Sequence, residues 1–93
     1  MLKPHQNVIG RRIAHLRYQR KWTQEVLAAK LQQEGYDISR ETVAWIETGR
    51  RGVSDELLVG FLKVFHLPFD CFFPPEIQKL SIKYAQQQTN FTP

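Results

Sequence analysis

The residues with the clearest recognition chemistry are Arg40, Thr42 and Trp45, which occur within one short stretch of the chain. An arginine guanidinium can bind O6 and N7 of guanine together, and a threonine can offer its hydroxyl to a base or its methyl group to thymine. In a helix drawn through this stretch, Val43 and Ile46 share one face, and the three recognition residues do not share it. The pattern predicts a helix that is packed from behind and reads a groove in front.

Polar residues around this helix could bind the phosphates of a polyanion. Gln24 opens the preceding helix and Ser39 caps the recognition helix, and the N–H groups at helix starts attract phosphate. Arg50 and Arg51 form a basic turn after the recognition helix, where they could bind phosphate or simply be solvated. Glu41 could accept a hydrogen bond from cytosine N4, or it could only support the start of the helix.

Three of these candidate contacts have a second interpretation. Arg40 could bind a phosphate or remain in solvent instead of reading a base, and Gln24 could be solvated. Trp45 could stack on a sugar or donate its indole N–H to the DNA backbone, but it could equally pack on the loop at Tyr36. The sequence leaves these alternatives open.

No arrangement of residues indicates catalysis or metal binding. His5, His15 and His66 do not occur with Cys71 at the spacing of metal ligands. The sequence also contains no glycine-rich phosphate loop and no plausible set of nucleophile, base and orienting residue. We therefore expect that the protein is not an enzyme and binds no cofactor or metal.

Positive charge is concentrated in the part of the chain that carries the candidate contacts. Residues 1–52 hold ten Lys and Arg and five Asp and Glu, a net charge of +5. Residues 53–93 hold three Lys and Arg and four Asp and Glu, a net charge of −1. Such asymmetry indicates a polyanionic partner, with a merely solvated basic surface as the alternative.

Length and composition are those of one small domain. The 93 residues, of which 42% are hydrophobic, are enough to bury a core. No apolar run is long enough to cross a membrane, and the first seven residues lack the apolar segment of a secretory signal. The single cysteine, Cys71, cannot form an internal disulfide and fits a reducing compartment. We expect a cytoplasmic protein without a membrane partner.

Apolar periodicity and capping residues predict an all-α domain over residues 1–75. Thr23, Ser39 and Ser54 are placed as N-caps of three of its helices. The helical segments are expected at about residues 5–20, 23–34, 39–48, 54 to the break at Leu67-Pro68, and 69–73.

Glycines and apolar residues refine this prediction. Gly35 is placed to end the second segment in a left-handed conformation, and the third segment is expected to stop at Gly49. The inward face of the fourth segment is predicted to consist of Leu58, Phe61, Leu62 and Phe65.

Residues 76–93 form a predicted C-terminal extension. Ile77, Leu80 and Tyr84 could make one weak amphipathic helix, which would indicate a dimer or partner interface if it covered an apolar patch. Residues 86–90 are typical of a fraying tail.

These residues resemble the Cro/repressor-type, or XRE-like, helix-turn-helix domains. The resemblance covers about residues 8–73, with several motifs in the family's order. The matching positions are Ile9-Gly-Arg-Arg-Ile13, Leu16-Arg17, Trp22-Thr-Gln-Glu, Leu27-Ala28, Ser39, Thr42-Val43, Ile46-Glu47-Thr-Gly49-Arg50, Ser54, Leu58, Phe61-Leu62, Phe65 and Leu67.

The resemblance implies a compact, lambda-repressor-like bundle of about five short helices. Members of the family are mostly bacterial or phage transcription regulators that bind operator DNA as dimers. The resemblance also implies that Gln24 contacts the DNA backbone, and that Arg17 and Glu47 form an ion pair that locks the recognition helix to the first helix.

We therefore expect a sequence-specific regulator of transcription, such as a repressor, that binds double-stranded DNA as a homodimer. Its recognition helix would span about residues 39–48 and lie in the major groove. The alternative is a protein-interaction module of the same fold, such as an antitoxin or an accessory subunit, whose partner the sequence does not identify.

Overall fold

Four α-helices and one 3-10 turn make up residues 8–72, the part of the chain that the computed structural model describes, without the side chains of Phe69 and Cys71. In chain order these elements are α1 (Val8–Gln19), α2 (Gln24–Gln33), α3 (Arg40–Glu47), α4 (Asp55–Phe65) and η1 (Phe69–Phe72). No strand occurs in this range, so the all-α prediction is confirmed for it, and none of its helices is long and apolar enough to cross a membrane. The fifth predicted segment is a single 3-10 turn rather than an α-helix. The predicted helix start near residue 5, the boundary at residue 75 and the extension 76–93 lie outside the described residues.

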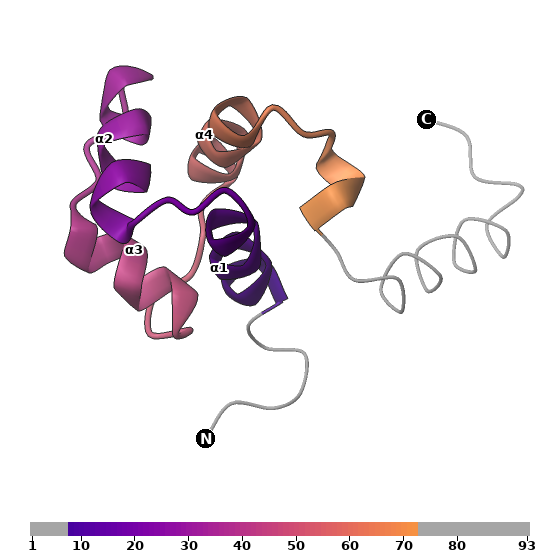
Figure 1. Cartoon of the computed structure of the whole chain (residues 1–93), viewed down its shortest axis with the longest axis horizontal. Helices are drawn as coiled ribbons and strands as arrows, with labels where there is room; N and C mark the ends of the chain where they lie inside the picture. The colour runs from indigo at the N-terminus through magenta and orange to yellow at the C-terminus, as the bar shows by residue number, and fades with distance from the viewer. Residues whose placement is uncertain (1–7, 73–93) are drawn as a thin grey trace, which may run out of the picture.

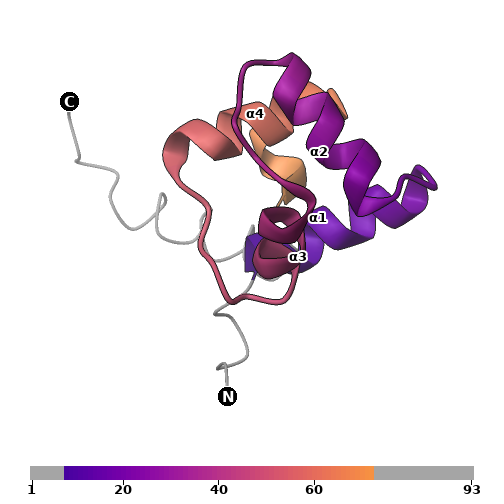
Figure 2. The same cartoon turned by 90° about the vertical axis from the view of Figure 1, so that its left-hand side faces the viewer.

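α3 lies at the edge of the molecule. In Figure 1, α2 and α3 lie together on the left, α4 lies above α1, and η1 continues on the right. Figure 2 turns that left side toward the viewer and shows α3 in front of α1. Because α3 packs against both α1 and α2, it rests on two helices and keeps its other side open.

The three predicted N-caps are confirmed. In each case a side-chain oxygen accepts a hydrogen bond from a backbone N–H of the first turn, which has no partner within the helix. The three bonds run from Val26 N to Thr23 Oγ1 at 3.0 Å, from Thr42 N to Ser39 Oγ at 3.2 Å, and from Leu57 N to Ser54 Oγ at 3.2 Å. The polar residues that the sequence places before each helix therefore fix where these helices begin.

The end of α3 is set by Gly49, as predicted. Gly49 has a φ of 82°, in the left-handed region that glycine adopts without strain. Its N–H donates to the carbonyl of Ile46 at 3.1 Å, and the N–H of Arg50 donates to the carbonyl of Trp45 at 2.8 Å. This pair of bonds is the Schellman arrangement, and it turns the chain so that Arg50 and Arg51 follow directly at the end of α3.

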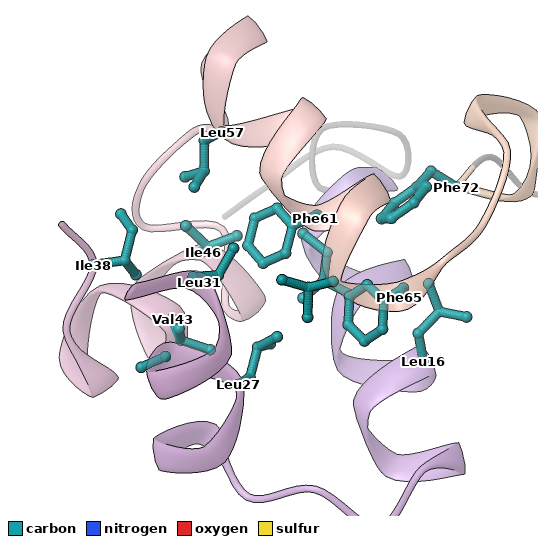
Figure 3. Packing of buried hydrophobic residues seen from close by; sticks show 13 residues of the cluster. Leu16, Leu27, Leu31, Ile38, Val43, Ile46, Leu57, Phe61, Phe65 and Phe72 are labelled. Carbon is teal, nitrogen blue, oxygen red and sulfur yellow. The ribbon is translucent and has the colours of Figure 1, made fainter. Parts of the chain in front are cut away.

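The core is a single cluster of buried apolar side chains, and Figure 3 shows Phe61 at its centre. Its members come from every element of the fold. They are Ile13, Leu16, Leu27, Ala28, Leu31, Ile38, Val43, Ile46, Leu57, Phe61, Val64, Phe65 and Phe72.

The predicted inward face of α4 is partly wrong. Phe61 and Phe65 are buried as expected, but Leu57 and Val64 are buried in place of Leu58 and Leu62, which are only half-buried. The reason lies at Gly60, where an added Cβ would lie 2.8 Å from Cε2 of Tyr36. Since the Tyr36 ring packs on Gly60, the helix presents the side that carries Gly60, Leu57 and Val64 to the core.

We expect Gly60→Ala to lower the free energy of unfolding by about 1–2 kcal/mol. Overpacking costs about 1–3 kcal/mol, and the better helix propensity of alanine returns up to about 1 kcal/mol. In a Tyr36→Ala background the ring is absent, so the same substitution should instead stabilise the fold by up to about 1 kcal/mol. Urea-induced unfolding of the four proteins measures this change of sign.

Gly52→Ala is a suitable control for this experiment, because nothing lies within 4 Å of a Cβ built on Gly52. An effect of Gly60→Ala that is the same with and without the Tyr36 ring would contradict the contact between these two residues.

Candidate nucleic-acid interface

The two sides of α3 differ sharply in exposure. Val43 and Ile46 are buried against α1 and α2, whereas Arg40, Glu41 and Trp45 are exposed. The N-cap Ser39 and the C-terminal turn at Gly49 hold the ends of the helix in place. The helix is therefore fixed from behind, and its front is available to another molecule.

The predicted outward position of Thr42 is wrong. Thr42 is only 7% exposed, and its hydroxyl lies 3.1 Å from the hydroxyl of Ser39. Thr42 precedes Ile46 by four residues, so the two share one side of a helix, and this side faces the core. The hydroxyl of Thr42 thus supports the start of α3 instead of facing outward.

Sequence reasoning missed two residues of the open side, Ala44 and Thr48. Both follow Arg40 at spacings of four and eight residues, so the helical period was the signal that could have identified them. Ala44 is half-buried, and the hydroxyl of Thr48 donates to the carbonyls of Ala44 and Trp45 at 3.0 and 3.3 Å. Thr48 is therefore bound to its own helix, and Ala44 presents a methyl group between the exposed polar residues.

Arg40 and Glu41 lie side by side at the start of α3. Their side chains are 57% and 60% exposed, and Arg40 Nη2 lies 3.7 Å from Glu41 Oε1. An ion pair of this exposure and length stabilises the fold very little. Both side chains can therefore exchange this contact for one with a ligand.

Trp45 lies on the open side of α3, with 44% of its surface exposed. The Tyr36 ring, its alternative packing partner, lies against Gly60 of α4. The backbone carbonyl of Trp45 accepts hydrogen bonds from the N–H groups of Arg50 and Arg51 at 2.8 and 3.2 Å. The indole and the two exposed arginines therefore extend the open side of α3 toward its C-terminal end.

Arg17 and Glu47 are brought together by the fold and join α1 to the end of α3. Arg17 Nε donates to Glu47 Oε2 at 2.7 Å and Nη2 donates to Oε1 at 3.0 Å, with both side chains only 7% exposed. The third nitrogen, Nη1, donates to the carbonyl of Trp22 at 2.9 Å. This arrangement, the Arg17–Glu47 fork, fixes the axis of α3 relative to α1 with planar, charge-assisted bonds.

Within the fork, the charge of Arg17 does not change near neutral pH. The hydrogen bonds that Arg17 donates to Glu47 raise the pKa of the Arg17 guanidinium above its ordinary value, against the opposing effect of burial. Stabilisation by a base with a raised pKa is present at lower pH and is lost only as the pH rises through that pKa. Arg17 therefore remains charged at every physiological pH.

Gln24, a predicted phosphate contact, is held in the same network. Its side-chain Nε2 donates to Glu47 Oε1 at 3.1 Å, so three elements converge on one carboxylate. The amide nitrogen carries two hydrogens, and this bond uses one of them. Gln24 thus positions the end of α3 and retains one donor at the start of α2.

Among the described residues, no three His, Cys, Asp or Glu side chains gather in a way that could hold a metal ion. The chemistry of the open side is instead that of hydrogen bonding and charge. It consists of a guanidinium, a carboxylate, an indole and two further arginines on a rigid helix and its following turn.

A family model described as a helix-turn-helix domain matches residues 8–70. No curated protein and no solved structure matches the chain. The matched range runs from the first residue of α1 into η1, so it includes the α2–α3 unit and both helices that support it. The chain belongs to the helix-turn-helix domain family.

Proposed function

We propose that this domain is a sequence-specific, double-stranded DNA-binding regulator of transcription, and that within its family it is of the Cro/repressor type. The observation that carries the proposal is the construction of α3. Val43 and Ile46 bury its back, the Arg17–Glu47 fork fixes its end, and its front is exposed. A recognition helix that enters the major groove needs these properties, because it must be rigid and open along one side.

In the proposed complex, the residues of the open side divide into two groups. Arg40 and Glu41 read base edges near the start of α3, and Trp45 lies farther along the groove. Arg50 and Arg51 bind phosphates from the turn, while Gln24 and Ser39 approach phosphates at the starts of α2 and α3. The excess of positive charge in residues 1–52 supports a polyanionic partner.

We further propose that the protein acts as a homodimer. Two copies of α3 would then lie in successive major grooves on one face of the duplex, about 34 Å apart. Repeated rounds of binding to a random double-stranded DNA pool test the function and the symmetry together. A palindromic consensus is the expected result, and a pool that shows no enrichment would contradict sequence-specific binding.

Arg40→Ala and Arg51→Ala should weaken DNA binding in different ways. We expect Arg40→Ala to cost about 1–3 kcal/mol on the selected site and to relax the preference at one base pair, since one bidentate guanine contact is lost. Arg51→Ala should weaken all sequences alike and lower the salt slope by about one, since one phosphate contact is lost. Fluorescence anisotropy over a range of salt concentrations, with the selected duplex and a mixed-sequence duplex, measures both effects.

The exposed Lys63 on α4 provides a control for charge alone, because Lys63→Ala removes one positive charge away from α3. If Arg40→Ala and Arg51→Ala weaken both duplexes to the same extent, the division between base and phosphate contacts is wrong.

A further inference from the structure

Two glutamates lie beside Arg40 where the proposed function requires contact with a polyanion. Glu41 is its neighbour at the exposed start of α3, with Oε1 3.7 Å from Arg40 Nη2. Glu25, the second residue of α2, lines two shallow surface hollows, and Arg40 lines both of them as well. One hollow also includes Tyr18 and Gln24, so it reaches from the end of α1 to the start of α3. Arg40 thus has the carboxylate of Glu41 3.7 Å away and shares both hollows with Glu25 of the neighbouring helix.

The net charge near the start of α3 therefore differs from the net charge of the turn that follows the helix. At the start of the helix, Arg40 and Glu41 line one hollow with Glu25 of α2, and the three residues sum to one net negative charge. The turn after the helix carries Arg50 and Arg51, which are both exposed and sum to two positive charges. The residues around the end of α3 that is placed to read bases therefore attract phosphate less than those at the opposite end do.

We propose that Glu25 and Glu41 are specificity-determining residues, which prevent Arg40 from binding phosphate and leave it available for guanine. This inference rests on the proposed function. A phosphate that binds Arg40 brings a negative charge to the carboxylate of Glu41 and to the hollows that Glu25 lines. Guanine presents O6 and N7, which are neutral acceptors and meet no such repulsion. The two glutamates therefore weaken sequence-independent contacts at Arg40 more than they weaken the specific contact.

A purely structural role would give a different outcome. Acidic residues in the first turn of a helix stabilise it through the helix dipole, and both glutamates occupy such positions. Glu56 is the second residue of α4, just as Glu25 and Glu41 are the second residues of α2 and α3. Glu56 does not line either hollow beside Arg40, so Glu56→Gln is a matched control for helix position and charge.

The test compares the full-length chain with its Glu25→Gln, Glu41→Gln and Glu56→Gln variants. Anisotropy titrations use the duplex selected by the wild-type protein and a mixed-sequence duplex. We expect Glu25→Gln to tighten binding to mixed DNA about threefold to tenfold and to change binding to the selected duplex by less than about twofold. The salt slope on mixed DNA should rise by about one, because Arg40 gains a phosphate contact. Glu41→Gln should shift the affinity for mixed DNA in the same direction, and Glu56→Gln should leave the ratio of the two affinities unchanged.

Each other outcome has a distinct meaning. If Glu25→Gln leaves the ratio of selected to mixed affinity at the wild-type value, the role proposed for the two glutamates is overturned while DNA binding stands. If Glu56→Gln lowers the ratio as much as Glu25→Gln does, the effect belongs to net charge and that role is again overturned. If the wild-type chain binds no duplex even at low salt, the proposed function fails and this inference fails with it. Thermal unfolding of all variants separates these results from a loss of fold.

Discussion

Replacing Arg17 by alanine should lower the free energy of unfolding by about 3–5 kcal/mol, which is a large part of the stability of a domain of this size. The loss does not come from the attraction alone. Arg17→Ala leaves the Glu47 carboxylate, whose side chain is 7% exposed, without two of its donors in a place that water hardly reaches. An uncompensated buried charge is far more costly than the loss of an exposed ion pair. The carbonyl of Trp22 loses a donor as well.

Urea-induced unfolding of Arg17→Ala, Glu47→Ala and the double variant measures this effect. We expect each single variant to lose several kcal/mol, and the double variant to lose clearly less than their sum, because it leaves no unpaired charge. Arg40→Ala is the control, since its ion pair with Glu41 is exposed, and it should change stability by less than about 0.5 kcal/mol. If Arg17→Ala costs no more than Arg40→Ala, the fork does not hold α3 in place.

The sequence predicts the ends of the helices well because these depend on local chemistry. Thr23, Ser39 and Ser54 cap their helices through their own hydroxyls, and α3 stops at Gly49, which is left-handed. A cap needs only a suitable residue and its next three neighbours. No long-range contact has to be known to predict such a feature.

The left-handed residues that follow the C-terminal ends of α1 and α4 were not predicted from such local signals. Lys21 and His66 have φ values of 59° and 55°, a left-handed conformation that is unfavourable for residues other than glycine. The N–H groups of Trp22 and Leu67, which follow them, donate back to the carbonyls of Arg17 and Leu62. Trp22 and Leu67 pack against the core after these turns. The sequence predicted the break at Leu67-Pro68 but not the left-handed residues before these two.

The errors at Thr42 and on α4 share one physical cause. A helical pattern indicates which residues share a side, but the angle at which that side meets the core depends on the neighbouring helices. On α3 the core side extends to Thr42, and on α4 the contact between Gly60 and Tyr36 moves Leu58 and Leu62 to the edge. The hydrogen bond from Gln24 to Glu47 was not predicted either, because 23 residues separate them and only the fold brings them together.

The open side of α3 was predictable only in part. Arg40, Glu41 and Trp45 carry chemistry that is evident from their residue types, and all three are exposed. Glu25 gave no such signal, because its position in the first turn of a helix already explains it. Only the fold places Glu25 with Arg40 on the border of the same hollows.

Phe65, the last residue of α4, packs against the segment that joins α1 to α2. Its ring stacks on Trp22 with centroids 5.6 Å apart, and it contacts the rings of Phe61 and Phe72 at 6.2 and 6.1 Å. The guanidinium of Arg20 lies 5.0 Å from the centroid of the same ring and donates to the carbonyl of Phe65 at 3.1 Å. Since Trp22 also accepts a hydrogen bond from Arg17, the ring cluster and the Arg17–Glu47 fork share one residue.

Phe65→Ala should therefore cost about 3–5 kcal/mol, through the lost apolar burial and the cavity that remains among the three rings. Near-UV circular dichroism should weaken at the same time, because Trp22 loses the ring on which it stacks. Val59→Ala, on the exposed side of the same helix, is the control and should change stability by no more than about 0.5 kcal/mol. Both variants are compared by urea-induced unfolding with the wild-type chain.

Because Trp22 contacts both the ring cluster and the fork, the effects of Phe65→Ala and Arg17→Ala on stability should not be additive. Phe65→Ala and Arg17→Ala each remove one contact of Trp22, so together they should cost at least 0.5 kcal/mol less than the sum of their separate effects. A sum that is additive within error would mean that the ring cluster and the fork act independently. α3 would then keep its orientation without the ring cluster, and Phe65→Ala should leave the selectivity of DNA binding intact under conditions where the protein remains folded.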